Sequence, residues 1–252
     1  MVMKIENYIG TADTFTWPYN PKVYDDATDP NYQITQIGFQ KHHILISGDG
    51  INTKKLVING HFSGTNKLTS WRSCSKHFLQ TTLLKKFFFE SDKFYLGVGK
   101  QIKKTHSAGR TNFIDYVGTF EAIVGVLFGD TEKVSGTNDG NVRTFITEIT
   151  GTYDGSGDII ITDDLGNEIT IDSAHLTINH PFTYKLVQMV DSGNGIFVSE
   201  YGYVELNSVQ SKNVQTTGGF GILQLEAGAN MSTIVTQNLN TVVTKFRDGY
   251  YD

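Results

Sequence analysis

Hydrophobic spacing constrains this chain more than any other feature, because only one segment shows the period of an amphipathic helix. Between residues 67 and 84, one set of side chains falls on a single face at helical spacing: Leu68, Trp71, Ser75, Phe78, Leu79, Thr82 and Leu83. Elsewhere the apolar residues come in short runs separated by turn-forming residues, which is typical of strands. The sequence therefore predicts a mostly β protein with a single helix.

The strand-like runs fall into two groups on either side of a polar segment. The segment from Asp130 to Asn141 is polar and turn-prone, as domain boundaries usually are. We expect an N-terminal domain over residues 1–130, a β-sandwich or split-barrel-like sheet that packs against the helix. A second, all-β domain, a sandwich or small barrel, is expected over residues 131–252. We leave open that the last strand returns to the first domain.

Individual strands can be assigned from β-rich runs and the turns that bound them. In the first domain they are expected at 43–47, 55–62, 87–89, 94–98, 101–107 and 113–128. In the second domain they are expected at 144–150, 158–162, 168–172, 184–190, 196–204, 220–225 and 232–246. Trp71 and Phe78 of the helix are expected to pack on the sheet that carries Phe87, Phe89 and Tyr116.

The single cysteine and the N-terminus bear on the compartment. Cys74 is the one cysteine, so the chain cannot form an internal disulfide, and its place among apolar helix positions indicates a small core residue. The N-terminus lacks the apolar stretch of a signal peptide, and the longest nearly apolar run, Ala122 to Phe128, is too short to span a bilayer. We expect a soluble protein made in a cytoplasm.

Charge is strongly segregated along the chain, although the net charge is only -5. Residues 51–112 hold twelve Lys and Arg against two acids, a balance of +10, whereas residues 113–252 hold six against eighteen, a balance of -12. Such a distribution predicts that a basic face meets an acidic face across a subunit contact, or that the basic face meets nucleic acid. We favour the subunit contact because the chain itself supplies both signs of charge. The candidate interface residues are Lys54, Lys55, Lys103 and Lys104.

The basic segment is also interleaved with aromatic residues, a mixture that single-strand nucleic-acid binders use. These aromatic residues are Phe87, Phe88, Phe89, Phe94 and Tyr95. Alternation along strands favours the other interpretation, in which much of this aromatic set lies in the core and the lysines are solvated. Sequence-specific binding of nucleic acid is therefore not expected.

Motifs for catalysis or metal binding are missing from the sequence. It contains no nucleophile elbow, no phosphate-binding loop, no zinc-protease helix and no paired cysteines. The cluster Asp163, Asp164, Asn167 and Glu168 offers oxygens to calcium, but the surrounding residues fit a hairpin with a Gly-Asn turn better. We expect no enzymatic activity, no cofactor and no metal.

Part of the chain resembles a known protein family. The matching residues are the Gly48-Asp49-Gly50 turn, the segment Lys55 to Gly64, the helix with Leu68 and Trp71, the segment Phe87 to Leu96 and the segment Tyr116 to Ala122. In this order they resemble the N-terminal domain of distal tail proteins of long-tailed bacteriophages, over about residues 35–130. In that family a turn with Asp-Gly precedes a strand that ends in a pair of glycines, a helix follows, and a long strand closes the unit.

The resemblance implies a structural component of a virion. Members of the family form a hexameric ring that joins the tail tube to the tail tip or baseplate, and their second domain is often a galectin-like sandwich or another small β-fold. The implied partners are further copies of the chain, the tail-tube protein and the tail-tip hub protein. A major tail-tube protein, which has a related fold and also forms hexameric rings, is the alternative within this class.

A carbohydrate-binding module that mediates adsorption to the host is the alternative from a different class. Glycan sites combine exposed aromatic rings with amide or carboxylate side chains. Residues of these types in the second half of the chain give Tyr153, Asn194, Tyr201 and Tyr203 as candidate glycan contacts. A receptor-binding protein is a further partner that this alternative would allow.

Overall fold

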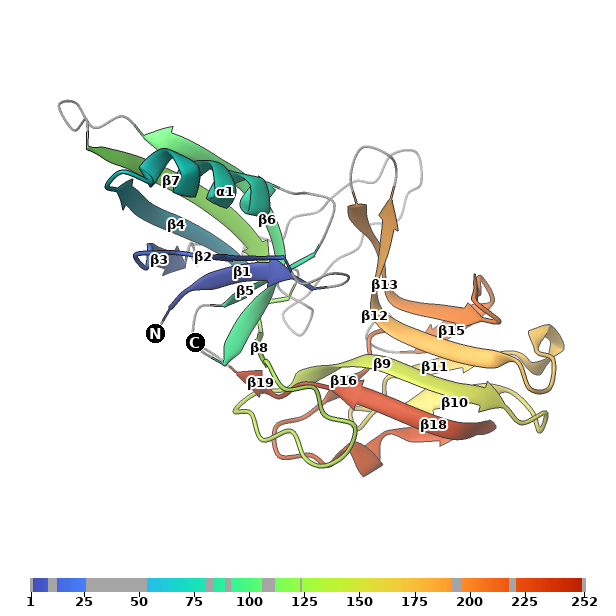
Figure 1. Ribbon diagram of the computed structural model, residues 1–252. Coiled ribbons are helices and arrows are strands. Elements are labelled where there is room, and N and C mark those ends of the chain that lie inside the picture. The colour runs from blue at the N-terminus through green and yellow to red at the C-terminus, as the bar shows by residue number, and fades with distance from the viewer. Residues whose placement is uncertain are drawn as a thin grey trace. The chain divides into compact units, whose positions relative to one another are not determined.

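The computed structural model describes residues 2–8, 13–25, 54–79, 84–88, 92–105, 112–122, 124–191, 196–217 and 221–250. The chain divides into two compact units, Met1–Gly125 (unit 1) and Val126–Asp252 (unit 2). Strands dominate both units, and α1 (Lys67–Leu79) is the one α-helix among the described residues (Figure 1). The mostly β fold with a single helix is therefore confirmed.

Unit 1 is built on an antiparallel sheet with the strand order β2-β1-β5-β6-β7-β4-β3. Its central strands are long, and β7 pairs along its length with β4 on one side and β6 on the other. A bulge between Gly99 and Gln101 shifts the register of β6, so the two strands expected at 94–98 and 101–107 are one strand. The strands are β1 (Lys4–Asn7), β2 (Thr14–Thr16), β3 (Lys22–Asp25), β4 (Lys54–Ser63), β5 (Lys85–Phe88), β6 (Lys93–Thr105) and β7 (Phe113–Ala122).

Helix α1 packs against one face of this sheet, with contacts to β4, β6 and β7 (Figure 1). That face carries the buried side chains of alternate strand residues, such as Leu56 and Ile58 on β4 and Tyr116 and Phe120 on β7. We call it the helix face. The other side of β3, β4, β7 and β6, where alternate residues are half-buried or exposed, is called the open face.

The buried side of α1 agrees with the prediction at Phe78, which is 1% exposed, and Trp71 contacts the ring of Tyr116 with centroids 6.2 Å apart, as expected. The other buried positions differ from the predicted ones. The buried residues of α1 are Cys74, His77 and Phe78, while Leu68 and Leu79 are 43% and 41% exposed and Trp71 is half-buried. His77 is drawn inward because its ring nitrogen Nε2 lies 2.8 Å from Asp13 Oδ1, and Nδ1 lies 2.8 Å from the Ser73 carbonyl oxygen. The described helix spans Lys67–Leu79, and Thr82 and Leu83 of the predicted face lie outside the described residues.

Unit 2 contains two antiparallel sheets, which agrees with the prediction of a sandwich-like fold. One sheet has the order β15-β11-β10-β17, and the other has the order β14-β13-β12-β9-β16 with β18 also paired to β9. The strands are β8 (Leu127–Gly129), β9 (Thr144–Tyr153), β10 (Ile159–Thr162), β11 (Glu168–Ile171), β12 (Pro181–Asp191), β13 (Ile196–Leu206), β14 (Val209–Gln210), β15 (Val214–Thr217), β16 (Gln224–Leu225), β17 (Val235–Gln237), β18 (Leu239–Phe246) and β19 (Gly249–Tyr250). Two short 3-10 helices lie at Ser173–His175 and Met231–Thr233.

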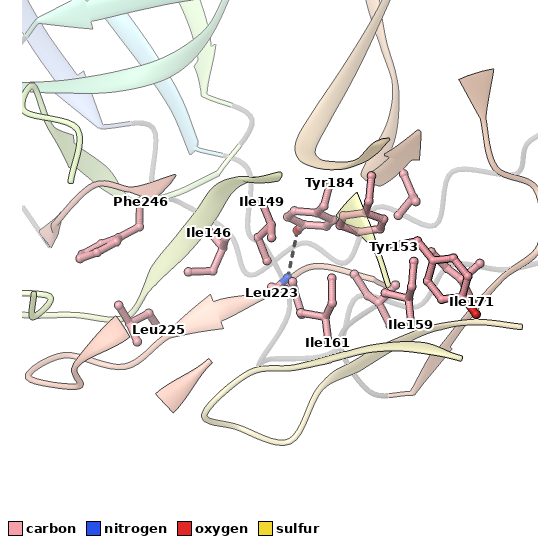
Figure 2. Close-up of a cluster of buried hydrophobic side chains, with 13 residues drawn as sticks. Ile146, Ile149, Tyr153, Ile159, Ile161, Ile171, Tyr184, Leu223, Leu225 and Phe246 are labelled. Carbon is pink, nitrogen blue, oxygen red and sulfur yellow. Dashed lines mark hydrogen bonds between the residues drawn. The ribbon is translucent and has the colours of Figure 1, made fainter. Parts of the chain in front are cut away.

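The core of unit 2 is a cluster of isoleucines, leucines and aromatic residues (Figure 2). Strands β10 and β11 supply alternate isoleucines, among them Ile159 and Ile171, as expected for strands with one buried face. The buried Tyr184 hydroxyl accepts a hydrogen bond of 3.1 Å from the Leu223 backbone N–H, which satisfies a polar group inside this apolar cluster.

The segment from Asp130 to Asn141, which the sequence predicted to be a polar boundary, is held to the rest of unit 2. Lys133 pairs with Phe246, and Thr137 pairs with Asn230 in isolated bridges. Ahead of this segment, β8 pairs with β19, so the first and last strands of unit 2 lie side by side. The two ends of unit 2 are therefore adjacent.

Candidate interaction surface

The four lysines predicted to form an interface lie on β4 and β6, the two neighbours of β7. Lys54 and Lys55 stand opposite Ala122 and Glu121, and Lys103 and Lys104 stand opposite Val117 and Tyr116. Because consecutive side chains of a strand point to opposite faces, each adjacent pair is divided between the two faces of the sheet. Lys54 and Lys104 belong to the helix face, and Lys55 and Lys103 belong to the open face.

The two lysines on the helix face contact aromatic rings of unit 1. Lys54 Nζ donates a hydrogen bond of 2.8 Å to the Tyr95 hydroxyl and lies 5.1 Å from the ring centroid. Lys104 Nζ lies 5.5 Å from the ring of Trp71 on α1, a cation–π distance. Both ammonium groups therefore interact with aromatic side chains of unit 1 itself.

The two lysines on the open face are exposed but stand apart from each other. In the strand register, Lys55 stands opposite Glu121 of β7 and Lys103 stands opposite Val117. These two positions are four residues apart along β7, which is roughly 13 Å. Glu121 also forms an ion pair of 3.3 Å with Lys100. The four predicted lysines therefore do not form one cluster, although two of them share the open face.

Other basic and aromatic residues of the segment 51–112 lie in the interior. Lys85 is 1% exposed and donates a hydrogen bond to Asn7 Oδ1, and its burial lowers the pKa of its ammonium group. Four of the five candidate base-stacking rings are 0–1% exposed: Phe87, Phe88, Phe94 and Tyr95. These rings are not available to stack on bases, which agrees with the interpretation that they belong to the core.

The candidate glycan contacts do not come together as an exposed site. Tyr153 is 4% exposed, and its hydroxyl accepts a hydrogen bond of 3.3 Å from the Gly157 N–H. Tyr203 is 7% exposed. Tyr201 pairs with Val187 in the β12–β13 ladder, and Asn194 lies outside the described residues. Since a sugar needs exposed rings, the expectation for Tyr153 and Tyr203 is corrected: their rings are buried in the unit that was expected to present them.

The acidic cluster at Asp163 forms the predicted hairpin. Strands β10 and β11 pair from Ile159↔Ile171 to Thr162↔Glu168, and Asp163 lies in the connecting turn. Its Oδ1 accepts hydrogen bonds from the N–H groups of Leu165 and Asn167, and its Oδ2 accepts from the Gln224 N–H and the Asn167 side chain. The carboxylate thus holds the turn and ties it to the β16 segment. Within the described ranges no group of three or more His, Cys, Asp and Glu could hold a metal ion.

Sequence reasoning missed a group of exposed rings on the open face of unit 1. Tyr19 is 56% exposed and stacks on His61 with ring centroids 5.9 Å apart, and Phe113, 40% exposed, meets His61 edge-on at 5.4 Å. We call these three residues the open-face patch. The alternation along β4 could have revealed this position. Leu56, Ile58 and Phe62 are buried on one face, so His61 must point to the opposite face.

Charged and aromatic residues surround the open-face patch on the same sheet. On β3, Lys22 and Tyr24 stand opposite Asn59 and Val57, which places them on the open face, and Tyr24 is 49% exposed. On β7, Asp115 stands opposite His61. The open face therefore carries exposed aromatic residues near the end where β4 finishes and β7 begins, and exposed lysines at other positions along the same sheet.

No helix among the described residues is long and apolar enough to cross a membrane.

No protein-family model matches the chain, and no curated protein matches it. Among solved structures, the chain is similar to the Dit protein of phage SPP1, described as a paradigm of hub adsorption apparatus in Gram-positive infecting phages. The TM-score is 0.39 and the identity 11%, over 99% of this chain and 93% of that chain.

Two further similar structures come from the baseplate of phage p2 in its activated conformation. The chain from the structure with Ca has a TM-score of 0.44 and 11% identity, over 98% of this chain and 97% of that chain. The chain from the structure with Sr has a TM-score of 0.41 and 10% identity, over the same shares of the two chains. These neighbours are phage hub and baseplate proteins, the class that the sequence resembles.

Proposed function

We propose that this chain is a distal tail protein of a long-tailed bacteriophage, a structural virion protein without catalytic activity. Copies of it form a closed ring, a hexamer in the family that the sequence resembles, at the distal end of the tail. The ring joins the tail-tube protein on one side to the tail-tip or baseplate hub on the other. The protein is made in the cytoplasm of the host cell and functions in the virion.

The observation that carries this proposal is the order of elements over the residues of the resemblance. Strand β4 is followed by α1, and the long strand β7 returns to pair with β4 from Lys54↔Ala122 to Ser63↔Phe113. This is the order that the resemblance implies: a strand ending in two glycines, a helix and a long closing strand.

The two glycines at the end of β4 have physical roles in that order. A Cβ at Gly60 would lie 2.5 Å from the Tyr116 hydroxyl oxygen, so the absent side chain makes room for a buried ring of β7. Gly64 has a φ of +78°, a conformation that side chains disfavour, and it lies between β4 and α1. These two glycines of the resemblance are thus residues that this arrangement of strand and helix requires.

Self-assembly of the purified full chain tests the proposal. Light scattering coupled to size-exclusion chromatography, over increasing protein concentration, is expected to give the mass of one closed oligomer that does not grow further. Negative-stain images of the same peak should show single rings, whereas open stacks of rings would favour the tail-tube alternative. A monomer at high concentration, both alone and with the tail-tube protein, would overturn the ring.

A further inference from the structure

The open-face patch differs from ordinary exposed residues because its rings are already packed against one another. The His61 ring contacts both Tyr19 and Phe113, so the three side chains are already packed together before a second protein binds. Pre-ordered aromatic side chains lose little conformational freedom on binding, and aromatic residues are enriched at the centres of protein interfaces. In the isolated chain Tyr19 and Phe113 are 56% and 40% exposed, and burial of such aromatic surface in a contact would be favourable.

The shape of the surface favours a protein partner over a small ligand. Small-molecule sites are concave and enclose most of the ligand. The open-face patch lies on strands β4 and β7, where the side chains around it, such as Asn59, Ser63 and Val117, are half-buried members of a continuous sheet face. A broad face of this kind can bury a large accessible surface against a partner, as stable protein contacts do.

The charges of the open face indicate the chemistry of the partner. The open face carries exposed lysines at positions 22, 55 and 103, against the two acids Asp115 and Glu121. Unit 2 holds sixteen Asp and Glu against six Lys and Arg, a balance of -10, while unit 1 has fifteen against ten acids, a balance of +5. The opposite charge that a complementary contact needs is therefore carried by the chain itself, in the residues of unit 2.

We propose that the open-face patch is the centre of the contact with a second copy of this chain, and that it docks on an acidic surface of that copy. This inference rests on the proposed assembly into a ring. The contact is heterologous, since a basic aromatic surface of one copy meets a different, acidic surface of the next. Head-to-tail contacts of this type build a closed ring when the rotation from one copy to the next closes.

Sedimentation velocity of the full chain over a range of concentrations tests the inference. The variants Tyr19→Ser and Phe113→Ser are expected to weaken self-association at least about 10-fold each, as for aromatic residues at the centre of an interface. Tyr19→Phe keeps the ring and should assemble like the wild type. Leu68→Ser on α1 is the matched control, because it removes an apolar side chain of similar exposure, 43%, outside the open face.

The outcomes separate this inference from the proposed function. Wild-type assembly by both patch variants, with unchanged melting temperatures, would overturn the inference and leave the ring in place. If these variants assemble normally but lose binding to cell-wall polysaccharide, the patch belongs to a carbohydrate instead. A wild-type monomer at every concentration, both alone and with the tail-tube protein, would overturn both. If Phe113→Ser fails to fold, Tyr19→Ser still decides, because Tyr19 lies outside the strands.

Discussion

At the scale of single residues, burial determines what the only thiol can do. Cys74 is 0% exposed on the inner side of α1, and burial raises the pKa of its thiol to about 12. Since the thiolate is the reactive form, a disulfide reagent should modify Cys74 at pH 8 only as fast as the protein unfolds. Thiol labelling in increasing urea measures this. The control Cys74→Ser/Lys76→Cys, with its thiol on the exposed side of the helix, should react at once, and equal rates in native buffer would contradict the prediction.

The Asp13–His77 contact predicts a loss of stability in acid. The hydrogen bond from His77 holds the pKa of the Asp13 carboxyl below its ordinary value, with desolvation opposing the shift. The contact therefore stabilises the fold above the unfolded carboxyl pKa of about 4, and this contribution disappears as pH falls through the lower folded value. Urea unfolding should show a gap in the free energy of unfolding between wild type and Asp13→Asn at pH 7, and this gap should narrow as the pH falls below about 4.

A double-mutant cycle separates this contact from other effects of the substitution. Asp13→Asn combined with His77→Gln should cost less than the sum of the two single changes at pH 7, because both remove the same interaction. Additive costs, or a gap between wild type and Asp13→Asn that stays constant with pH, would show that the contact contributes nothing.

Some residues could be predicted from the sequence and others could not. Cys74 was correctly placed in the core, since a cysteine among apolar helix positions behaves as a small hydrophobe. Lys85 belongs to the basic segment 51–112, whose lysines were expected to be solvated, yet it is 1% exposed beside Asn7. A lysine is buried only where distant parts of the chain supply its partner, and this pairing across 78 residues has no local signal.

At the scale of elements, one asparagine holds the segment that the sequence marked as a boundary. Asn138 is 0% exposed, and its Nδ2 donates to the carbonyls of Val142, Leu225 and Glu226 at 2.9–3.2 Å. Its Oδ1 accepts from the N–H groups of Gly140 and Gly249, both at 3.1 Å. Polar, turn-prone residues indicate a loop but cannot show whether its backbone groups are bound to water or to the protein.

Replacing Asn138 should therefore destabilise unit 2 strongly. Asn138→Ala leaves several buried backbone groups without a partner and should lower the free energy of unfolding by about 3 kcal/mol. Urea unfolding followed by circular dichroism measures the change. Ser135→Ala, an exposed position of the same segment, should change stability by less than about 0.5 kcal/mol. Equal effects of the two variants would contradict the role given to Asn138.

The elements with strong hydrophobic periodicity were the most predictable. Strands β9 to β13 lie where alternation indicated them, because their inner residues meet one core. Strand β15, with the sequence Val-Gln-Thr-Thr, was missed because it is mostly exposed and has no apolar alternation. Phe78 of α1 was correctly predicted to be buried. Leu68 and Leu79 were wrongly placed beside it because they look like core residues by type, whereas His77 is buried through its contact with Asp13.

At the scale of the whole molecule, the segregated charges predict an assembly that weakens with salt. Attraction between exposed basic and acidic surfaces is screened over roughly 8–10 Å at physiological ionic strength. The two neighbouring lysines of β6 provide a sharp test, because Lys103 is on the open face and Lys104 is on the helix face. Lys103→Glu should weaken self-association more than Lys104→Glu, with the difference shrinking at 1 M salt.

Light scattering at several salt concentrations measures this difference between the two reversals. Exposed lysines contribute little to folding, so the melting temperature of Lys103→Glu should be close to that of the wild type. Equal effects of the two reversals would contradict an interface on the open face. Tight, salt-sensitive binding of DNA by the wild type, together with normal assembly of both variants, would favour nucleic acid as the ligand of the basic segment.

Because β8 pairs with β19, the first and last strands of unit 2 are neighbours, as in a domain that can be inserted into another chain. Phe128 stands opposite Gly249, so the chain enters and leaves this unit at neighbouring points on the same short ladder. A unit with adjacent ends can be cut out, circularly permuted or exchanged for another domain without stretching the chain on either side.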